Sequence, residues 1–300
     1  MKTRTLLASV AATATCLGVA AGVGGGAPTA AAAPGDNIVT FGDSYFANPN
    51  PDEFFGSKIA HQAPEQIRNA PGIKERLDGY APGGCGHDKA NIPARVGMKT
   101  GVEVRDYSCS GATMYTPSAG TTLQGEVDKA VAEHALDGQT KLVVIQIGFN
   151  DTYQQALTPK PVKANLYGAA ADRAVAAIRG AAPNARIMFM NYPTISEPNT
   201  SMQCLIHVDV VGQPVDGGVP AFWIEVGEKE TSEFAQAAAE RNGGEFLDVR
   251  TPTANRHECT PDNQRIVAGV IDTRTKDYNL PVHLNAEGEE ILANEIAARY

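Results

Sequence analysis

The sequence predicts an α/β fold with a central parallel sheet, and three observations support this. Five short segments rich in apolar and β-branched residues read as strands. Segments with apolar residues at helical spacing separate most of them, which is the order that builds a parallel sheet covered by helices. The run KLVVIQIG at 141–148 is apolar almost throughout, as expected for a strand covered on both faces.

The predicted strands are residues 38–41, 102–109, 141–148, 185–193 and 245–250. The predicted helices are residues 123–136, 162–182, 222–242 and 285–300, and a short helix could lie within 92–101. Asn285 is the expected N-cap of the last helix. Residues 51–100 otherwise look mostly irregular. Residues 195–222 look like a long irregular insertion that either shapes a substrate cleft or forms a disulfide-tied surface loop.

The N-terminus reads as a secretory signal peptide over residues 1–32. Lys2 and Arg4 precede an uncharged apolar stretch, and Ala30 and Ala32 fit a cleavage site. The alternative is a retained single-pass anchor. No long apolar run follows, so we expect no stable membrane insertion after cleavage. Residues 33–300 show no linker and should form a single domain that is secreted.

The charge balance argues against nucleic acid as a partner. Cleavage would remove Lys2 and Arg4 and no acidic residue, so the net charge would change from −9 to −11. An acidic protein is not attracted to nucleic acid or to anionic lipid by its overall charge.

Four cysteines follow the signal peptide, and an even number in an exported protein suggests two disulfides. Four cysteines allow three pairings. We favour Cys85 with Cys109 and Cys204 with Cys259, because sequential pairing closes short local loops. Free buried thiols are the alternative. No pair has metal-ligand spacing and no loop has calcium-ligand spacing, so we expect neither a metal nor another cofactor.

Four polar or flexible residues fall at the edges of predicted elements. Ser44 follows the first strand, Gly111 the second and Asn150 the third, and His283 lies just before the last helix. Ligands of open α/β sheets bind beyond the carboxyl ends of the strands. A hydroxyl, an imidazole, an amide and a flexible glycine are the groups that acyl transfer needs.

These four blocks, FGDSY, CSGAT, GFND and VHLNAEG, resemble those of the SGNH (GDSL-type) hydrolases, in the same order along residues 37–300. The stretch from Cys85 to YSCSGAT is similar to secreted actinobacterial esterases and lipases of that family. The resemblance implies a flavodoxin-like three-layer α/β/α sandwich, the SGNH hydrolase fold. By contrast, the sequence lacks the second glycine of the G-x-S-x-G elbow of α/β-hydrolases.

The resemblance also implies the role of each residue. Ser44 would be the nucleophile and His283 the general base. The oxyanion hole would consist of the backbone N–H groups of Ser44 and Gly111 and the side chain of Asn150. Asp43 and Asp151 are more suited to bracing their loops than to chemistry. The remaining histidines show no paired spacing and should be non-catalytic: His61, His87, His134, His207 and His257.

One position departs from the family pattern. Members commonly carry Asp three residues before the histidine, and here that residue is Leu280. We predict that the main-chain carbonyl of Leu280 orients His283. Asp277 or Asp272 could instead take this role, or the enzyme could be impaired. A carbonyl carries no full charge, so the pKa of His283 should stay near about 6.5, with activity rising through about pH 6–7.

The predicted function is that of a secreted serine esterase or lipase acting on a small-molecule or lipid ester, as a monomer. One alternative is a polysaccharide O-acetylesterase or a hydrolase or transferase of cell-envelope lipid acyl groups. Another, of a different class, is a catalytically silent envelope-binding protein. Possible walls of an acyl pocket, or else ordinary core and surface aromatics, are Tyr45, Phe46, Tyr192 and Trp223.

Overall fold

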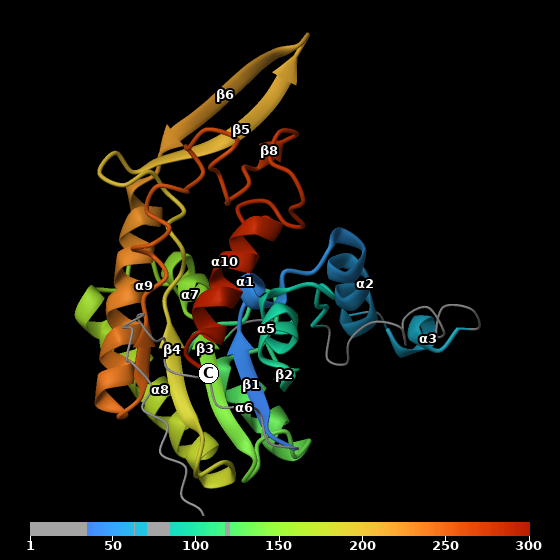
Figure 1. The fold of residues 1–300 in the computed structure, drawn as a ribbon, viewed down its shortest axis with the longest axis vertical. Coiled ribbons are helices and arrows are strands. Elements are labelled where there is room, and N and C mark those ends of the chain that lie inside the picture. The colour runs from blue at the N-terminus through green and yellow to red at the C-terminus, as the bar shows by residue number, and fades with distance from the viewer. Residues whose placement is uncertain (1–34, 63, 71–84, 118–120) are drawn as a thin grey trace, which may run out of the picture. The chain divides into compact units, whose positions relative to one another are not determined.

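The computed structural model describes residues 35–62, 64–70, 85–117 and 121–300, and residues 31–300 form one compact unit. The predicted signal peptide lies outside the described residues. A five-stranded sheet forms the centre (Figure 1). Its strands are β1 (Asn37–Gly42), β2 (Glu103–Asp106), β3 (Thr140–Gln146), β4 (Arg186–Met190) and β7 (Glu245–Leu247).

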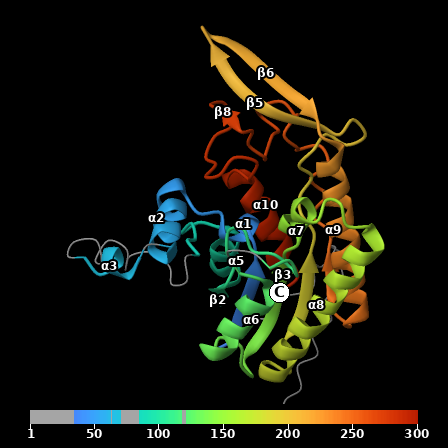
Figure 2. The ribbon, with the colours of Figure 1, turned by 180° about the vertical axis from the view of Figure 1, so that it is seen from behind.

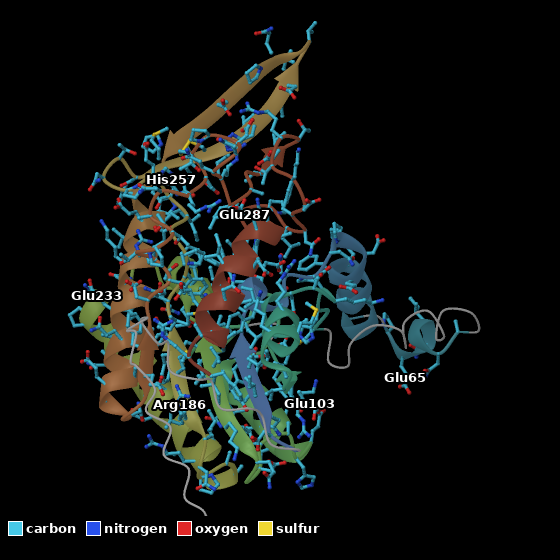
Figure 3. All side chains as sticks on the ribbon, viewed as in Figure 1. Glu65, Glu103, Arg186, Glu233, His257 and Glu287 are labelled. Atoms are coloured by element: carbon cyan, nitrogen blue, oxygen red, sulfur yellow. A yellow bond between two sulfur atoms is a disulfide. The ribbon has the colours of Figure 1, made fainter. Side chains whose placement is uncertain are left out.

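All pairings in this sheet are parallel, and the strand order is β2-β1-β3-β4-β7. This is the flavodoxin-like order, in which the chain reverses its direction of winding between β1 and β3. The crevice at the carboxyl ends of these two strands is therefore where a ligand is expected. In Figure 3, Glu103 and Arg186, the first residues of β2 and β4, lie at the opposite end from His257 and Glu287.

Helices cover both faces of the sheet, and the central strands β1, β3 and β4 are buried along most of their length. Leu142 and Val144 of β3 belong to one buried cluster, and Val143 and Ile145 to the other. The first cluster includes residues of α1 (Ser44–Ala47), α5 (Ile92–Thr100) and α10 (Ala286–Ala297). The second includes residues of α6 (Leu123–Ala132), α8 (Lys160–Ala181) and α9 (Phe222–Arg241), seen from behind in Figure 2. The expected three-layer α/β/α sandwich is confirmed.

Local signals explain the main helix boundaries. The side chain of Asn285 accepts a hydrogen bond from the N–H of Gly288 at 2.9 Å, so Asn285 is the N-cap of α10, as predicted. Asn91 caps α5 in the same way by accepting from Ala94 at 2.9 Å. The observed strand is shorter than the expected 102–109, since β2 ends at Asp106. The N–H groups of Tyr107 and Cys109 still donate to the carbonyls of Thr40 and Gly42 in β1.

Two segments expected to be irregular are ordered, and those predictions were wrong. Residues 51–68 form α2 (Pro51–Gln62) and α3 (Glu65–Arg68). Residues 202–220 form an antiparallel hairpin, β5 (Met202–Val210) and β6 (Gln213–Pro220), with the short β8 (Ile271–Asp272) alongside β5. The hairpin turns at Val211 and Gly212, both with positive φ, and is drawn beyond the carboxyl end of the sheet in Figure 1.

Candidate active site

A pocket of about 530 Å³ brings three of the four predicted residues together. Its walls come from the loops after β1 and β2, from α2 and from the segment before α10. The lining residues are Ser44, Pro51, Phe54, Phe55, Ser110, Gly111, Asn279, Leu280, Pro281 and His283. Asn150 does not line this pocket but lies beside two of its loops, as described below.

Ser44 is held at the end of β1 by close packing and a helix cap. A Cβ on Gly42 would lie 2.8 Å from the carbonyl oxygen of Gln146, so only glycine fits where β1 passes β3. Asp43 then caps the short helix α1, accepting a hydrogen bond from the N–H of Tyr45 at 3.0 Å. The turn leaves Ser44 partly exposed to the pocket while its neighbours on both sides are buried.

Gly111 follows β2 with a φ of 85°, in the left-handed region that favours glycine. No atom lies within 4 Å of the position that a Cβ would take, so the glycine is required by conformation rather than by crowding. Its loop is fixed on one side by the N–H of Cys109, which donates to the Gly42 carbonyl at 2.9 Å. The side chain of the same residue forms the Cys85–Cys109 disulfide, which restrains the loop further.

Asn150, in the first turn of α7 (Phe149–Gln154), connects the two loops. Its Nδ2 donates to the carbonyl of Ala112 at 2.8 Å and lies 3.5 Å from Oδ2 of Asp43. The hydroxyl of Tyr153 donates to Oδ1 of Asn150 at 3.0 Å, which sets the orientation of the amide. The amide nitrogen is therefore directed toward the residues that adjoin Gly111 and Ser44.

His283 lies between β8 and α10, and its two ring nitrogens differ. Nδ1 is 2.8 Å from the main-chain oxygen of Pro281, which can only accept, so Nδ1 carries the proton. Nε2 is buried and has no hydrogen-bond partner within the part of the chain that the structure describes. The neutral ring thus has a proton-accepting nitrogen available on the side away from Pro281.

The carbonyl that faces His283 belongs to Pro281 and not to Leu280, so that prediction was wrong by one residue. The intervening Val282 has a φ of 61°, which turns the chain back so that the carbonyl two residues before the histidine reaches its own ring. Asp272 does not orient His283. Its carboxylate instead accepts hydrogen bonds from the N–H groups of Gly269, Arg274 and Thr275.

The expected pKa of His283, near the ordinary histidine value, was also wrong. Burial disfavours the charged imidazolium and lowers the pKa of His283 to about 4, although the Pro281 carbonyl acts in the opposite direction. The ring is therefore neutral at pH 7, which is the form that can accept a proton.

The two aspartates beside the site brace its loops, as predicted. The carboxylate of Asp151 accepts from the N–H groups of Met114, Tyr115 and Thr116 at 2.6, 3.1 and 2.8 Å. Asp43 accepts from the Tyr45 N–H and from the Tyr192 hydroxyl, and burial raises its pKa to about 7.

The aromatic walls of the pocket are Phe54 and Phe55 of α2, which the sequence analysis missed. A signal for this helix was present in Asn50 and Pro51. Asn50 accepts from the N–H of Glu53 at 2.9 Å, and proline suits the first helical position that follows. The aromatics proposed instead do not line the pocket: Tyr45, Phe46 and Tyr192 are buried, and Trp223 is exposed.

A second cavity, of about 760 Å³, has charged walls, and three of its charged lining residues are paired with one another. Arg274 donates to Asp262 at 2.7 and 2.9 Å, and Arg265 also contacts Asp262. None of the four predicted residues lines it. In the described ranges, no group of three His, Cys, Asp or Glu side chains could hold a metal ion.

The profile of the GDSL-like lipase/acylhydrolase family matches residues 40–291, which is most of the chain. The chain belongs to the GDSL-like lipase/acylhydrolase family. It is therefore a carboxylic ester hydrolase, and its blocks around Ser44, Gly111, Asn150 and His283 all lie within the matched region.

The chain is similar to three proteins of Streptomyces, one compared by sequence and two by structure. The chain is 25% identical to Lipase 2 of Streptomyces coelicolor, over 97% of this chain and 94% of that protein. It is 17% identical to an extracellular lipase of Streptomyces rimosus, with a TM-score of 0.52 and coverage of 86% and 98% of the two chains. A phospholipase A1 of Streptomyces albidoflavus is 16% identical, with a TM-score of 0.51 and the same coverage.

Proposed function

We propose that the protein is a secreted serine esterase or lipase that cleaves carboxylic esters through an acyl-enzyme. The observation that carries this proposal is the shared pocket of Ser44, Gly111 and His283, with apolar walls beside the hydroxyl. The neutral His283 with a proton-accepting Nε2 supports the role of general base.

In the first half of the reaction, Ser44 Oγ attacks the ester carbonyl carbon and its proton moves to Nε2 of His283. The N–H groups of Ser44 and Gly111 donate to the oxyanion, together with the Nδ2 hydrogen of Asn150 that is not bonded to the Ala112 carbonyl. When the tetrahedral intermediate collapses, the C–O bond to the alcohol breaks and His283 returns the proton to that oxygen. Water then repeats the sequence on the acyl-enzyme and releases the acid.

The pocket favours an apolar acyl group. Phe54, Phe55 and Pro51 form one wall, and Leu280 and Pro281 contribute to another. Each buried methylene of a bound acyl chain contributes about 0.8 kcal/mol. The acetyl group of an acetylated polysaccharide would occupy only a small part of this pocket. A longer acyl chain would fill more of it and is therefore the better fit.

Secretion is supported by the sequence of residues 1–32 and by the disulfides. The structure pairs Cys85 with Cys109 and Cys204 with Cys259, the two pairs favoured from sequence, and disulfides persist in oxidising compartments. Among the described residues, no helix is long and apolar enough to cross a membrane.

The function is tested by the hydrolysis of p-nitrophenyl esters from acetate to palmitate by the wild type and by Ser44→Ala. We expect turnover in the wild type, with an optimum beyond acetate, and its loss in the variant. Equal turnover in both proteins would contradict the proposal, and an optimum at acetate would favour the acetylesterase.

A further inference from the structure

The side chain of Tyr45, next to the proposed nucleophile, lies against the ring of His283. The two ring centroids are 4.8 Å apart and the planes are inclined by 28°, which is a stacked arrangement. Tyr45 is only 5% exposed, so this contact is largely shielded from water. Tyr192 packs edge-on against Tyr45, with centroids 5.2 Å apart and planes at 85°. The tyrosine is therefore held in place by a second aromatic ring.

The hydroxyl of Tyr45 holds the backbone next to the histidine. It donates to the main-chain oxygen of Val282 at 2.8 Å. The N–H of Val282 donates to the carbonyl of Ala268 at 3.0 Å, and the N–H of Ala268 donates to the carbonyl of His283 at 2.9 Å. The first two bonds fix the peptide units on both sides of Val282, and the third fixes the peptide unit that follows His283.

This support matters because Val282 has a φ of 61°. A β-branched residue is rarely stable in the left-handed region, so surrounding contacts must maintain this conformation. The same conformation brings the Pro281 carbonyl to Nδ1 of His283. Tyr45 therefore contacts both the imidazole and the turn that orients it.

The proposed reaction also requires that the positive charge formed on His283 be stabilised. When Nε2 takes the proton of Ser44, a positive charge spreads over the imidazole ring, and a carboxylate usually stabilises it. Here Nδ1 meets only the neutral carbonyl of Pro281, and no carboxylate within the described chain hydrogen-bonds to the ring. The face of an aromatic ring carries negative charge and attracts a cation within about 6 Å of its centroid.

We propose that Tyr45 is a positioning residue that performs both tasks of the missing aspartate. Its hydroxyl maintains the turn that orients His283, and its ring face stabilises the imidazolium by a cation–π contact. The inference rests on the proposed function, because the imidazolium forms only if His283 accepts the proton of Ser44.

The test separates the hydroxyl from the ring face. Tyr45→Phe removes the bond to Val282 and keeps the stack, and kcat/KM should fall about 3- to 10-fold. Replacing that phenylalanine by pentafluorophenylalanine keeps the shape and reverses the charge of the ring face. We expect kcat to fall by a further factor of about 10 to 30, with KM unchanged. Equal kcat values for the two aromatic variants would overturn the cation–π role.

A matched control is Tyr278→Phe. The Tyr278 hydroxyl also donates to a backbone carbonyl, that of Asp272 at 2.7 Å, but Tyr278 has no ring contact with His283. We expect this variant to retain wild-type kcat/KM. A loss as large as that of Tyr45→Phe would mean that any such bond in the segment has the same effect, and would contradict the assigned role of the Tyr45 hydroxyl.

A second readout needs no turnover. In the Ser44→Ala background, the pKa of His283 is measured by NMR titration of its ring protons. Pentafluorophenylalanine at position 45 should lower this pKa by about one unit relative to phenylalanine. An unchanged pKa would overturn the contact even if the enzyme hydrolyses esters. A lowered pKa in a protein that hydrolyses no ester would support the contact and reject the function.

Discussion

The Nδ1 atom of His283 lies 2.8 Å from the main-chain oxygen of Pro281, two residues earlier in the chain. This bond sets the tautomer, so Nε2 is the ring nitrogen that can accept a proton. Burial lowers the pKa of His283. A carboxylate at Nδ1 would counteract this effect strongly, but the neutral carbonyl of Pro281 counteracts it only weakly. The pH behaviour of the enzyme should therefore differ from that of a serine hydrolase with a charged third member.

The first prediction is that activity persists well into the acidic range. Burial lowers the pKa of His283 to about 4, so the ring is protonated and inactive below that pH and neutral above it. We expect kcat/KM to rise through about pH 4 and to change little between about pH 5.5 and 8. The measurement is a pH–rate profile on a short-chain ester, with His283 followed in parallel by NMR. A single inflection between about pH 6 and 7, matched by the His283 titration, would disagree with this environment.

The second prediction concerns the acyl pocket. Phe55→Ala removes part of the α2 wall, so esters of medium and long acids should lose kcat/KM by about 5- to 30-fold while acetate changes little. The matched control is Phe222→Ala, since Phe222 is 66% exposed and does not line the pocket. The check is the chain-length profile of p-nitrophenyl esters for all three proteins. An equal loss on every chain length would show that Phe55 does not contact the acyl group.

The third prediction is that Asp151 contributes to stability through the loop it braces. Asp151→Asn replaces one acceptor oxygen by a donor in a buried site where three N–H groups converge. We expect the free energy of unfolding at pH 7 to fall by about 2 kcal/mol. Urea denaturation compares this variant with Asp128→Asn, an exposed carboxylate that contacts Gln124 on the same helix. Equal stability of the two variants would mean that the bracing bonds contribute little.

The fourth prediction separates the two disulfides. Replacing Cys85 and Cys109 together by alanine should lower stability by about 3–4 kcal/mol and also reduce kcat, because Cys109 lies two residues from Gly111. Replacing Cys204 and Cys259 should lower stability by about 4 kcal/mol and leave kcat unchanged, because neither residue lines the pocket. Thermal unfolding and steady-state kinetics measure both effects. A fall in kcat of the same size in both double variants would refute the distinction.

Much of the fold was predictable, because a strand that is buried on both faces consists of a continuous run of apolar residues. The run at 141–148 covers all of β3 except its first residue, Thr140, and the Asn285 cap marked the start of α10. The hairpin 202–220 was not recognised, because its second strand, β6, is exposed and combines glycine, proline and a charged residue. Helix α2 was missed because its periodic signal is weak, since Phe55 and Ile59 are the one pair of large apolar residues in it that has helical spacing.

For the candidate site, the sequence predicted which types of residue take part and that most of them follow the ends of strands. It did not predict the detailed contacts between them. Ser44 and Gly111 follow adjacent parallel strands, so topology alone brings them to one edge. The identity of the carbonyl at His283 was not predictable, because it depends on the positive φ of Val282, and valine gives no signal for that conformation.

The measurement that tests the central claim most directly is the mapping of a fluorophosphonate probe by mass spectrometry. Two serines, Ser44 and Ser110, line the same pocket, so the labelled position shows which of them is the nucleophile. If His283 activates Ser44, the probe labels Ser44 in the wild type and in Ser110→Ala, labels it slowly in His283→Ala, and does not react with Ser44→Ala. Labelling of Ser110, or undiminished labelling of Ser44→Ala, would contradict the assignment of the nucleophile.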